Sequence, residues 1–165
     1  RDRYCVDQTR LYATGYSLGS MFTYEIACQL NSRFAAVASF AGTMPVEPES
    51  CYLYNQVAVM HIHGKLDYII DYDDDWDWKD GEHEGVGTMS SIPGLIEDWA
   101  ARANCQEQVS HYHQEVEHVV HSDCSGDVRI EHHGMELTEH TWPNQVAWTN
   151  TAELIWRFLS QFDHA

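Results

Sequence analysis

Apolar residues along the chain alternate between nearly continuous runs and helical spacing. Strands are predicted at residues 11–14, 34–40, 57–63, 109–120 and 128–133. The first three are the uninterrupted kind found in parallel sheets that are covered on both faces. Helical spacing predicts helices over residues 17–30, after Ser90 or Ser91, and from about Asn150. This alternation predicts an α/β fold with a mainly parallel sheet flanked by helices.

Two of the predicted helices have recognisable start signals. A serine cap followed by Pro93 predicts the middle helix, and Asn150 with Glu153 resembles a capping box at the start of the last. The apolar face of the middle helix is predicted to comprise Ile92, Leu95, Ile96, Trp99, Ala100 and Ala103. That of the last helix is predicted to comprise Ala152, Ile155, Leu159 and Phe162.

Residues 15–19 read Gly-Tyr-Ser-Leu-Gly, a G-x-S-x-G motif between a predicted strand and a predicted helix. A sharp turn there exposes the serine hydroxyl at the carboxyl end of the sheet, and small neighbours let strand and helix approach each other. Gly15 and Gly19 are expected to provide that room. Ser17 is therefore the predicted nucleophile, and the N–H of Leu18 is a predicted oxyanion donor.

In an α/β-hydrolase the acid and then the histidine follow the serine along the chain. Asp67 lies just beyond the strand at 57–63 and is the predicted acid, with Asp71 as a rival. His140 lies on a loop before the last helix and is the predicted base. The rival histidines, His132 and His133, continue a strand pattern. The expected reaction is attack by Ser17 on an ester carbonyl and formation of an acyl-enzyme.

Charge and cysteine content narrow the function classes. The 165 residues carry a formal charge of −17, which disfavours nucleic acid and anionic lipid as partners, and no apolar stretch is long enough to span a membrane. The five cysteines form no CxxC pair. We expect a disulfide between Cys105 and Cys124, a buried thiol at Cys28, and a partner for Cys5 or Cys51 outside this chain.

Together these residues resemble the polyhydroxybutyrate depolymerase and feruloyl esterase family of secreted α/β-hydrolases. The resemblance covers nearly the whole chain, at residues 6–7, 10–17, 33–42, 61–64, 67, 99–105, 140–143 and 153–158. It implies a triad of Ser17, Asp67 and His140, hydrolysis of a polymeric or small aromatic or acyl ester, no metal or other cofactor, and secretion to the extracellular space. Tyr16 and Trp142 are the expected substrate-binding residues, although Trp142 is equally compatible with core packing.

Three departures from the family pattern stand out. Leu18-Gly19-Ser20 replaces the usual Asn-Gly-Gly, and residues 134–139 are more acidic than the family's glycine-rich run. The family's second oxyanion donor comes from an earlier loop, and the motif here begins only fifteen residues into the chain. We therefore expect residues 1–165 to be one catalytic domain of an α/β-hydrolase that lacks its N-terminal strands.

Other patterns favour weaker hypotheses. Asp73, Asp75, Asp77 and Glu84 are spaced as in a calcium loop, but Trp78 occupies the position that requires glycine. His61 with His63, and His111 with His113, each share a strand face without a matching third ligand for zinc. Trp76 and Trp78 could extend a substrate surface or pack their loop. The alternatives to an esterase are a serine peptidase of the prolyl oligopeptidase type and an inactive fragment.

Overall fold

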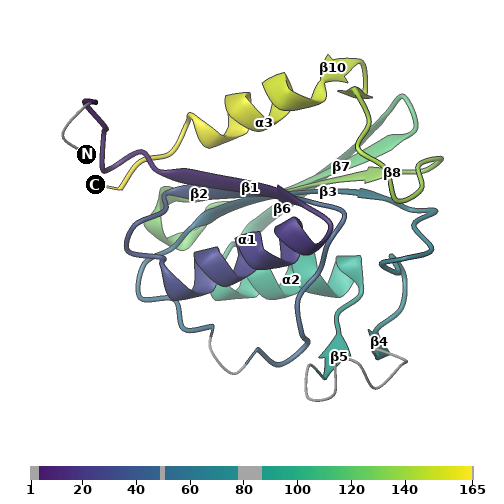
Figure 1. The fold of residues 1–165 in the computed structure, drawn as a ribbon, viewed down its shortest axis with the longest axis horizontal. Coiled ribbons are helices and arrows are strands. Elements are labelled where there is room, and N and C mark those ends of the chain that lie inside the picture. Colours follow the sequence, from purple (N-terminus) through teal and green to yellow (C-terminus); the bar gives the residue numbers. More distant parts are fainter. Residues whose placement is uncertain (1–3, 49–50, 78–86, 165) are drawn as a thin grey trace.

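The computed structural model describes residues 4–48, 51–77 and 87–164, and a six-stranded sheet forms its centre (Figure 1). The strands lie in the order β1-β2-β3-β8-β7-β6. The parallel strands are β1 (Tyr12–Tyr16), β2 (Ala36–Phe40), β3 (Ala58–Gly64) and β8 (Ile130–Met135). The antiparallel strands are β7 (Val116–Ser122) and β6 (Glu107–His113). Two short pairs accompany the sheet: β4 (Trp76–Asp77) with β5 (Thr88–Met89), and β9 (Gln145–Val146) with β10 (Thr149–Asn150).

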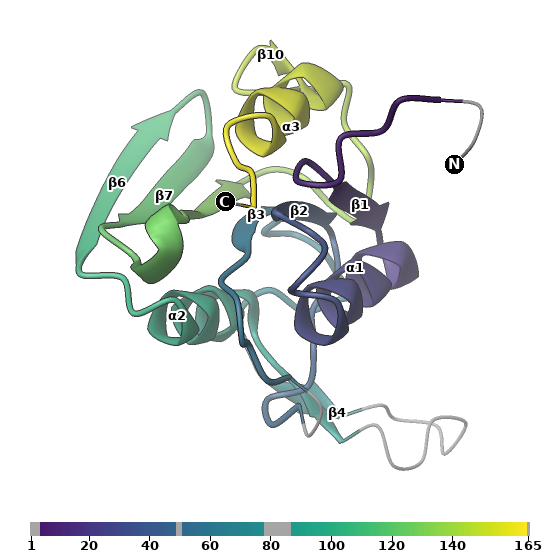
Figure 2. The same ribbon diagram turned by 90° about the vertical axis from the view of Figure 1, so that its left-hand side faces the viewer.

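Helices cover both faces of this sheet. The helices α1 (Leu18–Gln29) and α2 (Ile92–Arg102) lie on one face, and α3 (Thr151–Leu159) lies on the other (Figures 1 and 2). A short 3-10 helix, η1 (Ser125–Asp127), precedes β8. Every residue of β2 and β3 is buried, as their apolar runs predict for strands sandwiched between helices. The predicted α/β architecture with a mainly parallel sheet is confirmed.

The predicted strand over residues 109–120 is wrong as a single element. The chain folds there into a hairpin of β6 and β7, with Gln114 and Glu115 between the strands. Both turn residues have positive φ, 51° and 58°, as a two-residue hairpin turn requires. Because neither is glycine or asparagine, the sequence carries no strong turn signal at this point.

The helix predictions hold with two corrections. Ser91 occupies the cap position of α2 without a side-chain hydrogen bond, whereas the Asn150 side chain accepts one from the Glu153 N–H at 3.1 Å. All six residues predicted for the apolar face of α2 and its end are buried. On α3, Ala152 is exposed and Phe158 is buried in its place. No helix in the described part of the chain has the length and apolar character to cross a membrane.

Two disulfides lie on the described residues. Cys105 pairs with Cys124, as predicted. Cys28 pairs with Cys51, so the expectation of a buried thiol at Cys28 is wrong, and Cys51 has its partner within this chain. Cys5 is free and exposed. Helix α1 thereby becomes linked to the segment before β3, a contact that sequence spacing does not reveal.

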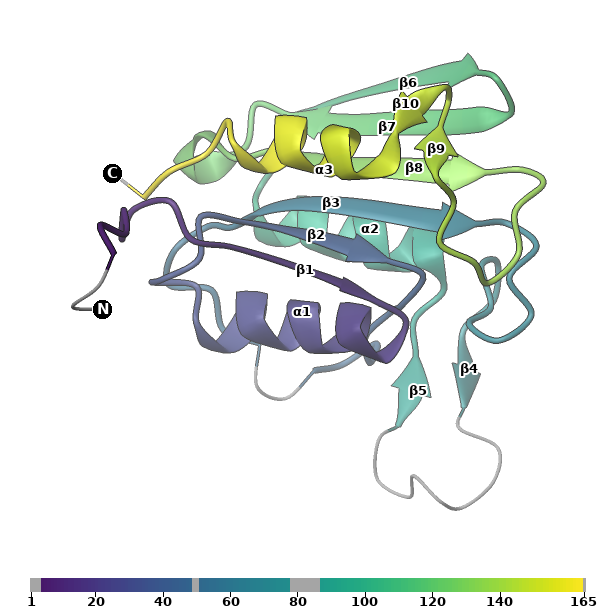
Figure 3. The ribbon, with the colours of Figure 1, turned by 45° about the horizontal axis from the view of Figure 1, so that its top comes forward.

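The carboxyl ends of β1, β2, β3 and β8 meet at one edge of the sheet (Figure 3). The segment that follows β8 passes this edge before it reaches α3. Side chains on the segments after β1, β3 and β8 are therefore brought together from distant parts of the sequence.

Candidate active site

Ser17 lies at the turn between β1 and α1, and its backbone angles, φ 55° and ψ −121°, are unusual for a residue with a side chain. A Cβ atom at Gly15 would overlap the backbone oxygen of Gly19, so strand and helix can approach only because residue 15 is glycine. A Cβ at Gly19 itself would meet nothing within 4 Å. Close approach of β1 and α1 therefore requires glycine at position 15. The expectation that Gly19 also provides this room is wrong, because the space around it would accept a side chain.

The structure brings together the three residues predicted as a triad. His140 Nε2 lies 2.9 Å from Ser17 Oγ, and His140 Nδ1 lies 2.6 Å from Asp67 Oδ2. An ionised carboxylate can only accept hydrogen bonds, so Nδ1 donates to Asp67 and leaves the Nε2 lone pair facing the serine hydroxyl. This arrangement allows His140 to remove the proton of Ser17.

Asp67 is fixed by four groups around its buried side chain. Oδ1 accepts hydrogen bonds from the N–H groups of Ile69 and Ile70, both at 2.9 Å, and Oδ2 faces His63 Nε2 at 3.1 Å as well as His140. Burial by itself raises the pKa of Asp67, but the hydrogen bonds from His63, Ile70, His140 and Ile69 outweigh it and lower the pKa to about 2. The carboxylate is therefore ionised at neutral pH.

Behind Asp67 lies a buried polar chain under the α1 and α2 face of the sheet. The Tyr24 hydroxyl lies 2.6 Å from His61 Nδ1, and His61 Nε2 lies 3.0 Å from His63 Nδ1. Because His63 Nε2 must donate to Asp67 or to the nearby Ile70 carbonyl, His61 donates to His63 and Tyr24 donates to His61. Burial, aided by the neighbouring His63 and His132, holds the pKa of His61 well below its ordinary value. The chain thus leads from Tyr24 to Asp67 and positions its carboxylate.

The rival residues lie elsewhere. Asp71 accepts hydrogen bonds from the N–H groups of Asp73 and Asp74, both at 3.0 Å, within its own exposed turn. His132 contacts the Tyr72 hydroxyl at 2.8 Å, and His133 stacks on His118. The geometry therefore brings together the preferred acid and base, and the three rivals contact other groups.

Aromatic side chains flank His140. The Tyr16 hydroxyl donates to the His140 carbonyl at 3.0 Å, and its ring lies 5.3 Å from the imidazole. Trp142 packs on Phe40 with ring centroids 4.8 Å apart, yet 42% of its surface is exposed. Trp142 thus packs against the core and also presents part of its ring to solvent.

Several residues that shape the site were not singled out from the sequence. A Cβ at Gly64 would overlap the carbonyl of Thr138, so this glycine lets the loop carrying His140 pass close to the end of β3. Phe40 supports Trp142. His63, which the sequence pairs with His61 on one strand face, contacts the carboxylate of Asp67. A glycine directly after a buried strand was the available signal for Gly64.

The other residues singled out from the sequence have different surroundings. Asp75 accepts a hydrogen bond from the Ser91 N–H at 2.7 Å, and Asp77 accepts one from the Thr88 hydroxyl at 2.6 Å, so both carboxylates bind their own loop. Trp78 and Glu84 lie outside the described residues. His111 and His113 are exposed on β6.

Leu18, the expected oxyanion donor, is the first residue of α1, where a helix leaves its N–H groups unpaired.

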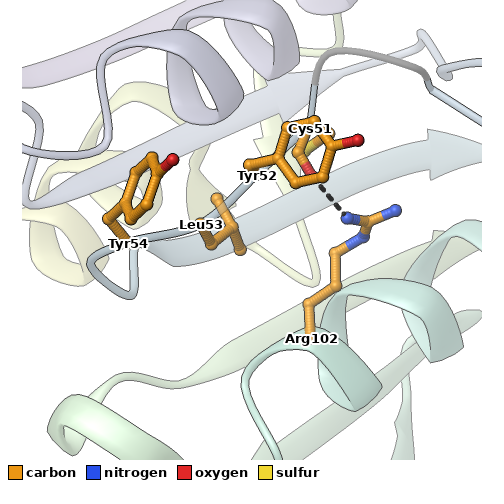
Figure 4. Close-up of a pocket in the computed structure, with 5 residues that line it drawn as sticks. All are labelled: Cys51, Tyr52, Leu53, Tyr54 and Arg102. Carbon is orange, nitrogen blue, oxygen red and sulfur yellow. Dashed lines mark hydrogen bonds between the residues drawn. The ribbon is translucent and has the colours of Figure 1, made fainter.

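A pocket of about 310 Å³ lies at the opposite edge of the sheet, before β3 and beside the end of α2 (Figure 4). It is lined by Cys51, Tyr52, Leu53, Tyr54 and Arg102. The Arg102 guanidinium donates to the Cys51 carbonyl at 3.0 Å and so joins the two walls. None of its lining residues belongs to the Ser17, Asp67 and His140 group.

Part of the chain is similar in sequence to proteins that are named esterases. No family model matches the chain. The bifunctional acetylxylan esterase/xylanase XynS20E of Neocallimastix patriciarum is 32% identical over 72 residues, which is 44% of this chain and 10% of that protein. The proteins named Probable feruloyl esterase C from Aspergillus flavus and from Aspergillus oryzae are each 32% identical over 72 residues, 44% of this chain and 26% of theirs.

The matched segment therefore spans only a small part of these curated relatives, 10% of the length of the first and 26% of the length of the other two. All three carry an esterase name, although the first is also named a xylanase. These similarities support a carboxylic-ester hydrolase and do not single out a polyhydroxybutyrate depolymerase.

Proposed function

We propose that this chain is the catalytic domain, or part of it, of a secreted serine esterase with an α/β-hydrolase fold. The observation that carries the proposal is the linear arrangement of Ser17, His140 and Asp67, joined by contacts of 2.9 and 2.6 Å at the carboxyl edge of the sheet. Ser17 also lies at a strained strand-to-helix turn, which is typical of the nucleophile in this fold. The esterase names of the similar proteins agree with this chemistry.

The first half of the reaction forms an acyl-enzyme. His140 Nε2 takes the Ser17 proton as Oγ bonds to the ester carbonyl carbon, and Asp67 stabilises the resulting imidazolium. The negative carbonyl oxygen is stabilised by the N–H of Leu18 at the start of α1. When the tetrahedral intermediate collapses, its bond to the alcohol breaks and His140 gives the proton to the departing alkoxide.

The second half releases the acid. A water molecule gives a proton to His140 and attacks the acyl carbon, and the bond to Ser17 Oγ then breaks as Oγ regains the proton. His63 acts as a positioning residue in both halves, because its Nε2 holds the Asp67 oxygen that also faces His140. It touches no reacting atom.

Tyr16 and Trp142 form one wall for the substrate in this proposal. The Tyr16 ring lies beside His140 and the Trp142 ring lies against Tyr16, and the two residues are partly exposed, at 36% and 42%. Flat aromatic faces suit feruloyl groups and also the repeating apolar surface of a polyester. Two disulfides agree with secretion into an oxidising compartment.

The test compares the chain with Ser17→Ala and with Ser110→Ala, a matched change at an exposed strand serine. We expect hydrolysis of p-nitrophenyl acetate to fall by roughly 10⁴-fold or more in Ser17→Ala and to stay unchanged in the control. A fluorophosphonate probe, with its site mapped by mass spectrometry, should label Ser17 alone. Methyl ferulate, acetylated xylan and hydroxybutyrate polymer then define the substrate class.

Two outcomes would overturn the proposal. One is ester hydrolysis that survives Ser17→Ala, because the nucleophile would then lie elsewhere. The other is a folded chain that neither hydrolyses any of these esters nor reacts with the probe, because an assembled serine and histidine pair should at least be acylated. Circular dichroism establishes that each variant is folded.

A further inference from the structure

Two histidines and a glutamate gather on the face of the sheet that α3 covers. His118 of β7 lies directly opposite His133 of β8, and Glu131 lies two residues before His133, so the three side chains share one face. The neighbouring Arg129 identifies this face, because its guanidinium lies over the rings of Phe158 and Phe162 at the end of α3. One donor atom from each member lies within 4.8 Å of the other two.

One ring nitrogen of the buried His133 side chain has no hydrogen-bond partner within residues 4–48, 51–77 and 87–164. His133 is 5% exposed, and in the described part of the chain nothing hydrogen-bonds to its Nε2. The Glu131 Oε2 atom lies 3.9 Å away, which is too far for a hydrogen bond. Buried polar atoms are rarely left unsatisfied, so this nitrogen points to a missing partner.

Glu131 is already oriented as a ligand would be. Its Oε1 atom accepts a hydrogen bond from Arg129 Nε at 2.5 Å, and its Oε2 atom turns toward His118 Nε2 at 3.0 Å. One oxygen is thus fixed from behind while the other faces both histidines. Metal-binding carboxylates are commonly held by such a second hydrogen bond.

We propose that His118, Glu131 and His133 form a site for a divalent transition-metal ion, with zinc the best match to two imidazole nitrogens and one carboxylate oxygen. Ligand bonds of about 2.0–2.2 Å require donor atoms closer than the present 3.9 Å pair. The rings stack at 4.1 Å and 11°, so binding tilts them toward a common point. The His118 Nε2 proton, now shared with Glu131, moves to Nδ1 or to solvent.

This site is separate from the proposed esterase chemistry. Its ligands lie within β7 and β8, whereas Ser17, Asp67 and His140 lie on segments that follow strands. An ion here would cross-link β7 to β8 and thereby fasten the β6–β7 hairpin to the parallel part of the sheet. Zinc binding should therefore raise thermal stability without being needed for ester hydrolysis.

The test uses chain stripped with a chelator and titrated with zinc by calorimetry, alongside His118→Ala and His133→Ala. His113→Ala is the matched control, since it removes an exposed strand histidine on β6. We expect one zinc ion per chain, a rise in Tm, and tetrahedral cobalt absorption bands after substitution. Each cluster variant should weaken binding by at least about 10–100-fold, the range seen for milder outer-shell changes, and the control should bind normally.

His118 is partly exposed, so His118→Ala should remain folded if His133→Ala does not. Weak binding of several ions, or none, would overturn the proposal. It would also fail if His118→Ala bound zinc as tightly as the unaltered chain. Because the readouts are binding and Tm, they are independent of whether the chain hydrolyses esters.

Discussion

The two faces of the sheet use histidine in opposite ways. On the α1 and α2 face, His61 and His63 form hydrogen bonds through both ring nitrogens and lead from Tyr24 to Asp67. On the α3 face, His133 has a buried nitrogen with no hydrogen-bond partner among the described residues, beside Glu131. A completed network holds a neighbouring group rigidly, whereas an incomplete one is prepared to accept a ligand.

Two adjacent histidines of β8 differ in their hydrogen bonds, so the surroundings of a histidine, and not its residue type, decide what it does. His132 contacts the Tyr72 hydroxyl and the His61 carbonyl, at 2.8 and 3.2 Å, while His133 points to the other face. Burial lowers the pKa of both side chains to about 3, so both are neutral. Charge state therefore does not distinguish them, and their hydrogen-bond partners do.

The largest effect is expected when the complete network is broken at His63. His63→Ala removes a 3.1 Å contact with an ionised carboxylate, and we expect kcat for p-nitrophenyl acetate to fall about 10- to 100-fold with little change in KM. His63→Asn retains an N–H donor and should recover part of the loss. The acid limb of the pH profile should also move in His63→Ala, because the carboxylate that stabilises protonated His140 is less well held.

The matched control on the opposite face is His118→Ala, which leaves the Asp67 contacts intact. Its kcat should equal that of the unaltered chain. An unchanged kcat and pH profile in His63→Ala would show that the two backbone N–H groups and His140 suffice to position Asp67.

A smaller effect on stability should separate the two neighbours on β8. In the presence of a chelator, His132→Leu leaves the Tyr72 hydroxyl unsatisfied and should lower the free energy of unfolding at pH 7 by about 1–3 kcal/mol. His133→Leu removes a nitrogen that has no hydrogen-bond partner in the described part of the chain, so it should cost less or stabilise the fold. Urea titration of both variants measures the difference, and equal losses would contradict the contrast between the faces.

The last effect concerns the loss of stability in acid. The pKa of His132 and of His133 is about 3 in the folded chain and about 6.5 in the unfolded chain, so above pH 6.5 neither state is protonated. As pH falls through 6.5 the unfolded chain takes up protons first, which lowers stability down to about pH 3. Between pH 7 and pH 5 each buried histidine should cost about 2 kcal/mol.

This loss is measured from Tm against pH. In His133→Leu the decline of Tm with falling pH should be shallower than in the unaltered chain, because one of the two buried histidines is absent. Zinc should raise Tm most at neutral pH and lose that gain as pH falls, because protons compete with the ion for the imidazole nitrogens, and it should leave the contribution of His132 unchanged. Identical curves for the variant and the unaltered chain would mean that His133 is protonated inside the fold.

Local patterns predicted more of this molecule than long-range contacts did. The apolar runs of β2 and β3 and the motif around Ser17 were visible because their physical causes are local. The turn at Gln114 and Glu115 lacked glycine, and the Cys28–Cys51 pair depends on how α1 packs. Asp67 and His140 were located by their order along the chain. The His118 and His133 pair could not be found, since it requires the register of β7 against β8.

The close passage at Gly64 has a consequence for how freely this region can vary. The loop before His140 is tied to the end of β3 by main-chain atoms, since the Thr138 carbonyl accepts from the Leu66 N–H at 3.0 Å and the Met135 carbonyl accepts from the Lys65 N–H at 2.8 Å. Main-chain atoms are the same in almost every residue type. The side chains of residues 137–139 can therefore vary while the imidazole stays where Ser17 can reach it, whereas Glu136 also binds Lys65 Nζ through its own carboxylate at 2.6 Å.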